Sequence, residues 1–86
     1  MIRAGVAGAA GRMGLAACAA IEAADDIELT GRADPLLGVP LAVILPDCDV
    51  VVDFTRPEAA LENARECLAG GVHVVIGTTG FDLGEL

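Results

Sequence analysis

The sequence predicts an α/β protein in which a parallel sheet of four to five strands carries helices on both faces. Short apolar runs rich in β-branched residues alternate with two longer segments of helical periodicity, which is the order of a parallel sheet with helical crossovers. A glycine recurs at every third position between the first apolar run and the first helical segment. The 86 residues, 55% of them hydrophobic, are enough for one small globular domain.

The first part of the chain predicts a strand, a helix and a second strand. Residues 2–7 (IRAGVA) form a short, largely apolar run, as expected of a buried strand. The alanine-rich residues 12–25 predict a helix whose small-residue face carries Met13, Ala16, Ala17, Ala20 and Ile21. Residues 27–33 (IELTGRA) predict a second strand, which ends at Asp34.

The middle of the chain predicts a loop and then a central strand. The loop is interrupted by three prolines, and we expect a short strand at residues 42–45 within it. Residues 49–54 (DVVVDF) are β-branched and uninterrupted, as expected of a parallel strand that is covered on both faces.

The last part of the chain predicts a helix with clear boundaries and a final strand. Thr55 is expected to cap the helix, with Glu58 three residues later as in a capping box and Pro57 in the first turn. One apolar stripe runs along it, formed by Ala60, Leu61, Ala64, Cys67 and Leu68. Gly70 and Gly71 permit a left-handed end, and residues 72–76 (VHVVI) predict another strand.

Charge and cysteine usage exclude several classes of function. A formal net charge of −8 argues against a nucleic-acid partner, because no basic stripe is present to replace the counterions of phosphates. Three scattered cysteines without a C-x-x-C pair predict buried, reduced thiols of a cytoplasmic protein, not a disulfide framework or a metal site. No apolar run is long enough for a membrane span or unbroken enough for an export signal.

The glycines at positions 8, 11 and 14 lie where a Rossmann-like dinucleotide-binding fold makes its first turn. Glycine at the first position allows the turn, at the second the approach of a pyrophosphate, and at the third close packing of helix on strand. The free amides and the dipole of the helix then form an anion site. Asp34 lies twenty residues beyond Gly14, at the end of the second predicted strand, where a carboxylate accepts hydrogen bonds from the ribose hydroxyls.

A second cluster, GTTG at residues 77–80, follows the last predicted strand. The carboxyl ends of parallel strands form the ligand crevice of open α/β sheets, so Gly77, Thr78 and Thr79 are candidates for contact with a ring carboxamide or a substrate. These features also fit a Rossmann domain of another dehydrogenase or of a redox-sensing regulator. A structural module in which the glycines serve packing alone is a further alternative.

Three short stretches carry a family resemblance. The stretches VAGAAGRMG and DFTRPE, followed by GTTGF, resemble the N-terminal domain of 4-hydroxy-tetrahydrodipicolinate reductase, a nicotinamide-dependent enzyme of lysine and diaminopimelate synthesis. The resemblance implies that the loop from Gly8 to Met13 wraps the pyrophosphate, that Asp34 holds the ribose, and that residues 77–79 face the nicotinamide. The implied cofactor-binding residues are Gly8, Ala9, Ala10, Gly11, Arg12, Met13, Asp34, Gly77, Thr78 and Thr79.

The resemblance also implies what this chain lacks. The catalytic groups of the family belong to a substrate-binding domain, so residues 1–86 are expected to be an incomplete dinucleotide-binding domain, truncated before that domain and without catalytic residues. The parent protein would act on a small-molecule substrate and form a homo-oligomer through the other domain. Pro35 stands where members that favour the phosphorylated cofactor often carry arginine, so NADH is the expected cofactor, with NADPH possible and Arg12 the nearest cation. The segment between Asp34 and Asp47 is shorter than is usual for the family, so the third strand is expected to be reduced or lost.

Overall fold

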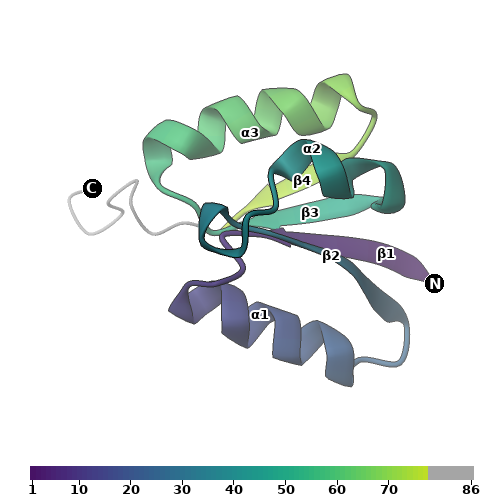
Figure 1. The fold of residues 1–86 in the computed structure, drawn as a ribbon. Helices are drawn as coiled ribbons and strands as arrows, with labels where there is room; N and C mark the ends of the chain where they lie inside the picture. The colour runs from purple at the N-terminus through teal and green to yellow at the C-terminus, as the bar shows by residue number, and fades with distance from the viewer. Residues whose placement is uncertain (78–86) are drawn as a thin grey trace, which may run out of the picture.

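A computed structural model describes residues 1–77 and contains four parallel strands with helices on both faces of the sheet (Figure 1). In chain order the elements are β1 (Ile2–Ala7), α1 (Arg12–Ala23), β2 (Ile27–Ala33), the 3-10 turn η1 (Pro35–Leu37), α2 (Leu41–Ile44), the 3-10 turn η2 (Leu45–Asp47), β3 (Val50–Asp53), α3 (Pro57–Ala69) and β4 (His73–Ile76). The strand order is β2-β1-β3-β4, with each neighbouring pair parallel. The predicted fold class is confirmed. Within this part of the chain, no helix has the length and apolarity needed to cross a membrane.

The two faces of the sheet bury two separate apolar clusters. Helix α1 lies on one face, whereas α2 and α3 lie on the other (Figure 1). The larger cluster is on the α2 and α3 side and consists of Ala7, Ala33, Leu41, Ile44, Cys48, Val51, Cys67 and Val72. The smaller cluster, under α1, consists of Val6, Ala9 and Cys18. With so few large side chains, the core depends on close approach of small ones.

The buried face of α1 differs from the predicted one. Gly14 and Cys18 are buried, with Ala17 and Ile21 half-buried beside them. Three residues of the predicted face are exposed: Met13, Ala16 and Ala20. The helix docks with Gly14 against the main chain of Gly8, and the neighbouring Met13 is left exposed.

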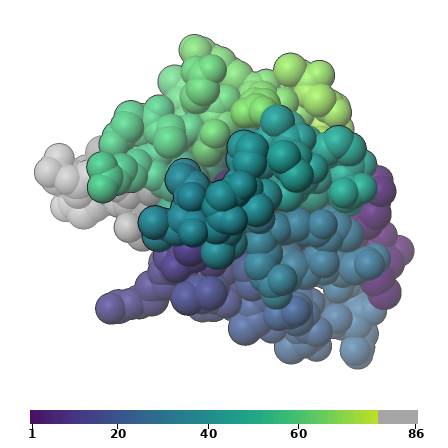
Figure 2. All heavy atoms as spheres, viewed as in Figure 1, coloured from purple at the N-terminus to yellow at the C-terminus, as the bar shows by residue number. Residues whose placement is uncertain are grey.

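The strand predicted at residues 42–45 is wrong, because these residues lie in α2 and η2. Pro40 precedes α2 and Pro46 lies within η2, and neither has the amide hydrogen that a strand ladder needs. Leu41 and Ile44, three residues apart, are the buried residues of α2. In the space-filling view, this segment is seated between α3 and the α1–β2 side of the molecule (Figure 2). Between β2 and β3 the structure has only an isolated bridge, between Asp34 and Val39, as expected of a third strand that is reduced or lost.

Two facing glycines make room for α2. The register between β1 and β2 shifts by one residue after Ala4, and Gly5 is then paired with Gly31. A Cβ atom on Gly31 would lie 2.6 Å from Cβ of Ile44, and one on Gly5 would lie 2.9 Å from its Cδ1 atom and 2.6 Å from Sγ of Cys48. The pair therefore forms a shallow seat into which Ile44 packs.

Helix α3 starts differently from the prediction and ends as predicted. Its N-cap is Arg56, without a side-chain cap, so the capping box expected from Thr55 is wrong. The Thr55 hydroxyl donates instead to the buried carboxylate of Asp53. Pro57 occupies the first turn, as predicted, and Gly71 has a φ of 74° just beyond the end of the helix.

Not all of the predicted apolar stripe of α3 is buried. Ala60, Ala64 and Cys67 face the sheet, whereas Leu61 and Leu68 are exposed. The buried side of the helix is therefore narrow and made of small residues. All three cysteines are free and buried, as predicted. Burial raises the pKa of the Cys67 thiol, and the nearby Asp53 carboxylate raises it further, so the thiol stays protonated.

Strand β4 is only partly covered. Val74 packs against the larger cluster, but Val75 is 55% exposed and Ile76 is 40% exposed. Val75 pairs with Val52, which in turn pairs with Val6 of the cluster under α1. Because α1 makes its main contacts with β1 and β2, it does not cover Val75 on β4. His73 is exposed at the start of the strand.

An ion pair joins the two central strands of the sheet, β1 and β3, at their amino ends. At the amino ends of β1 and β3, the Arg3 amide donates to Oδ2 of Asp49 at 2.9 Å and its guanidinium donates to Oδ1 at 3.0 Å. These hydrogen bonds lower the pKa of the Asp49 carboxyl and raise the pKa of Arg3. Both side chains are about half exposed, so the pair adds little to stability.

Replacement of Gly31 tests the packing of α2. Gly31→Ala places a Cβ atom where Ile44 lies, and we expect overpacking to lower the free energy of unfolding by about 1–3 kcal/mol. The matched control is Gly70→Ala, because a Cβ atom there would meet no atom closer than 3.6 Å. Urea denaturation of both variants measures the difference. Equal stability of the two variants would contradict this account of the α2 seat.

Candidate functional site

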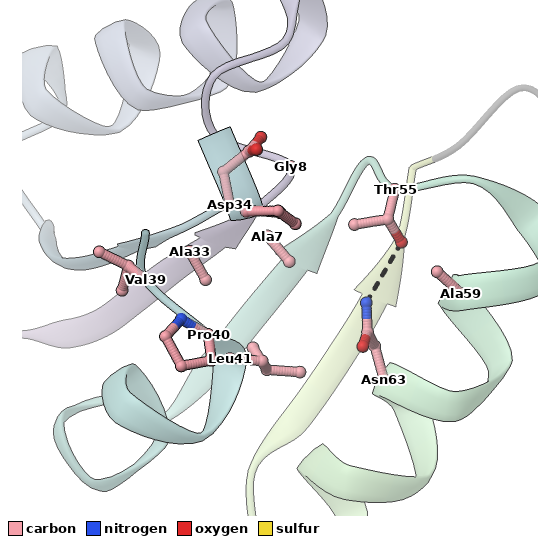
Figure 3. Close-up of a pocket in the computed structure, with 11 residues that line it drawn as sticks. Ala7, Gly8, Ala33, Asp34, Val39, Pro40, Leu41, Thr55, Ala59 and Asn63 are labelled. Carbon is pink, nitrogen blue, oxygen red and sulfur yellow. Dashed lines mark hydrogen bonds between the residues drawn. The ribbon is translucent and has the colours of Figure 1, made fainter. Parts of the chain in front are cut away.

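The carboxyl ends of β1, β2 and β3 border a cavity of about 190 Å³ (Figure 3). Its walls are mostly apolar, with one carboxylate and two polar side chains. The lining residues are Ala7, Gly8, Ala33, Asp34, Pro35, Val39, Pro40, Leu41, Thr55, Ala59 and Asn63. The cavity lies where a parallel α/β sheet places its ligand crevice.

The turn after β1 requires a glycine at its first position. Gly8 has a φ of 77°, a conformation that side chains other than glycine rarely adopt. A Cβ atom on it would also lie 3.0 Å from the carbonyl carbon of Phe54. The Gly8 amide donates to the Ala33 carbonyl at 2.8 Å, which ties the turn to the end of β2.

The start of α1 is open to an anion. Gly11 is the N-cap and provides no side-chain cap, and the first helical turn contains no acidic residue. Among residues 1–77, none accepts a hydrogen bond from the amides of Arg12, Met13 or Gly14. Free amides at the positive end of a helix dipole form a ready anion site. The Arg12 side chain is exposed beside them.

Asp34 connects this loop to the segment after β2. It is 8% exposed, and its carboxylate points toward the Gly8 turn (Figure 3). Its Oδ2 atom accepts from the Ala10 amide at 3.0 Å, and its Oδ1 atom accepts from the Leu36 amide at 2.9 Å. Each carboxylate oxygen accepts about two hydrogen bonds, so both keep capacity for a ligand hydroxyl.

Positive charge beside Asp34 is sparse. Arg32, at the end of β2, donates to Glu22 of α1 at 3.1 Å. Residues 33–47 contain no lysine or arginine. Arg12, the first residue of α1, is the cation that stands beside the free amides of that helix.

A polar network around the buried carboxylate of Asp53, at the end of β3, was missed by sequence reasoning. Oδ1 of Asp53 accepts from the Thr55 amide at 2.7 Å, and Oδ2 accepts from Nδ2 of Asn63 at 3.2 Å. Nδ2 of Asn63 also donates to the Thr55 hydroxyl at 3.2 Å (Figure 3). An aspartate at the end of an apolar strand, two residues before a threonine, is the signal that could have indicated it.

Gly77 lies two strands away from the glycine loop. Its amide donates to the Asp53 carbonyl at 2.7 Å, and a Cβ atom on it would lie 2.5 Å from the Phe54 ring. Any side chain at this position would displace that ring. The candidates Thr78 and Thr79 lie outside the described residues.

The predicted residues gather on one edge of the sheet. Along this edge the strand ends follow in the order β2, β1, β3 and β4, which places Asp34, the Gly8 turn, Phe54 and Gly77 in sequence. The glycine loop residues and Asp34 are in direct hydrogen-bond contact. Gly77 joins them through the turn after β3.

Comparison with known proteins gives a consistent family. The family model described as dihydrodipicolinate reductase, N-terminus, matches residues 2–86. The 4-hydroxy-tetrahydrodipicolinate reductase of Thermobifida fusca is 50% identical over 82 residues, covering 95% of this chain and 32% of that protein. The reductase of the same name from Nocardia farcinica is 45% identical over 86 residues, covering 99% of this chain and 34% of that protein.

A solved structure agrees with the sequence matches. Dipicolinate-bound dihydrodipicolinate reductase from Paenisporosarcina sp. TG-14 is similar with a TM-score of 0.75 and 26% identity, covering 99% of this chain and 40% of that chain. The chain thus spans about a third of the length of the curated relatives it matches.

Alanine substitutions at Gly14 and Gly11 are expected to differ in their effect on stability. Gly14→Ala places a Cβ atom against main-chain atoms of Gly8 and Ala9, so we expect it to lower the free energy of unfolding by about 1–3 kcal/mol. Gly11→Ala is the matched control, since its Cβ atom would meet no atom closer than 3.5 Å. Thermal denaturation of the two variants measures this. A Gly14→Ala protein as stable as Gly11→Ala would contradict the close contact.

Proposed function

This chain belongs to the dihydrodipicolinate reductase family, as its N-terminal part, and on that premise we propose that it binds the nicotinamide dinucleotide of the reductase. The observation that carries the proposal is the meeting of three features at one sheet edge: a positive-φ glycine turn, free amides at the start of α1, and the buried Asp34 carboxylate. Membership of this family favours the reductase over a redox-sensing regulator or another dehydrogenase.

The parts of the cofactor fit different parts of the edge. The diphosphate would accept from the amides of Arg12 and Met13, where the helix dipole adds to the attraction. The adenosine ribose would donate to Asp34, and the apolar cavity beside it would receive the adenine ring. The nicotinamide end would lie toward Gly77, two strands along the edge. When bound, the cofactor supplies the hydride, and these residues bind and orient it.

The reaction of the whole protein is then reduction of a cyclic, unsaturated dicarboxylate in lysine and diaminopimelate synthesis. This chain contributes cofactor binding and no catalytic residue. The small-molecule substrate and the contacts of a homo-oligomer belong to other parts of the protein. Three buried, reduced thiols fit the cytoplasm as its location.

Cofactor titration of the full-length protein tests the proposal. We expect saturable NADH binding, and an increase of the Kd of about tenfold or more in Gly11→Ala, because its methyl group would stand between the diphosphate and the amides of α1. Quenching or enhancement of NADH fluorescence measures both. Absence of saturation at millimolar NADH in the folded wild type would refute the function, and an unchanged Kd in Gly11→Ala would refute the placement of the diphosphate.

We also expect NADH to bind more tightly than NADPH. The 2′-phosphate of NADPH would stand against Asp34, which is held by two amides and has no basic neighbour in residues 33–47. Isothermal titration should give a Kd for NADPH about tenfold higher. Asp34→Ala should narrow this ratio by weakening NADH binding. Equal affinities in the wild type would be inconsistent with the role of Asp34.

A further inference from the structure

A fully buried carboxylate lies beside the proposed site without contacting the cavity. Asp53, the last residue of β3, is 0% exposed. The ion pairs within residues 1–77 join other side chains, and none of them reaches Asp53. Burial of a carboxylate without a cation is unfavourable unless its oxygens accept hydrogen bonds. The buried Asp53 carboxylate is therefore stabilised by the hydrogen bonds that it accepts.

The carboxylate holds the turn that follows it. Oδ1 accepts from the Thr55 amide at 2.7 Å and from the Thr55 hydroxyl, and Oδ2 accepts from Asn63 of α3 at 3.2 Å. The first pair fixes the chain direction immediately after β3, and the last bond anchors it to the helix. One side chain thus connects a strand, a turn and a helix.

The turn it holds fills the space between the two other loops of the edge. On one side, a Cβ atom on Gly8 would lie 3.0 Å from the Phe54 carbonyl carbon and 3.2 Å from the Thr55 amide nitrogen. On the other side, Gly77 lies against the Phe54 ring, and its amide donates to the Asp53 carbonyl. Because neither glycine leaves space, a shift of the turn would be transmitted to both loops.

We propose that Asp53 is a positioning residue of the dinucleotide site, which sets the relative places of the Gly8 turn and of Gly77 by fixing the turn at residues 54–55. The proposal rests on the proposed function, since the Gly8 turn and Gly77 are assigned to the diphosphate and nicotinamide ends of one cofactor. A bound dinucleotide would span both places, so its affinity depends on their spacing. Asp53 acts without touching the cofactor.

An asparagine side chain cannot replace this carboxylate. In Asp53→Asn the side-chain oxygen could still accept both bonds from Thr55, but the new amide nitrogen would then face the donor Nδ2 of Asn63. Reorientation of the Asn63 amide would relieve that clash and give up its present bond to the Thr55 hydroxyl. After that reorientation the new amide would donate to Oδ1 of Asn63, so Asp53→Asn keeps one bond to α3 but removes the direct bond between the turn and α3, with almost no change in volume.

The experiment compares Asp53→Asn with Asp49→Asn in the full-length protein. Asp49 lies just before the amino end of the same strand and is hydrogen-bonded to Arg3, away from the cofactor edge. We expect Asp53→Asn to raise the Kd for NADH by about tenfold at a temperature where the protein is folded. Amide hydrogen exchange without cofactor should be faster at Gly8, Thr55 and Gly77. Asp49→Asn should change neither the Kd for NADH nor the exchange rates of these three amides.

Each result bears on the proposal. Wild-type NADH affinity in Asp53→Asn, or wild-type exchange at the three amides, would overturn it. Equal effects of Asp49→Asn would also overturn it, because they would indicate a general loss of stability. If Asp53→Asn does not fold, Thr55→Val removes one of the same bonds and should speed exchange at Gly8 and Gly77; unchanged exchange would overturn the proposal. A wild type that does not bind NADH would refute the proposed function itself, whatever the exchange data show for the loops.

Discussion

The contact between α1 and the turn after β1 is the constraint on which the rest of the site depends. Gly14 rests on main-chain atoms of Gly8 and Ala9, where a side chain would push the helix from the sheet. The first helical turn is thereby brought to the edge of the sheet where the Asp34 carboxylate accepts a hydrogen bond from the Ala10 amide. In a chain of net charge −8, an anion has to be held by such local, oriented donors, since the overall field opposes it.

The loops of this edge continue the hydrogen bonding of the sheet beyond its strands. The Gly8 and Ala9 amides donate to the Ala33 carbonyl, and the Gly77 amide donates to the Asp53 carbonyl. Segments that are far apart in sequence are therefore held in order by main-chain bonds. The core is likewise built from small residues. Gly5 and Gly31 leave the space in which Ile44 of α2 packs. Packing and site geometry thus depend on the same scarcity of side chains.

Sequence reasoning succeeded where the chemistry is local. The glycine spacing and the interval to Asp34 predicted the turn, the helix start and the acid at one edge, and all of them are found there. It failed where a distant partner competes for a group. Thr55 has the features of a cap, but the buried Asp53 takes its hydroxyl. Residues 42–45 have strand-like side chains, but flanking prolines and the Gly31 seat favour a helical turn.

The sequence by itself determined the alternation of strands and helices, the position of the glycine turn and the scarcity of positive charge beside Asp34. Each of these follows from residue type and spacing along a short stretch, because periodicity and backbone freedom are local properties. The tertiary structure decided which side of α1 is buried, where Ile44 packs and which donors reach Asp53. These depend on groups far apart in the chain that become neighbours after the strands pair, and spacing along the sequence does not encode such contacts.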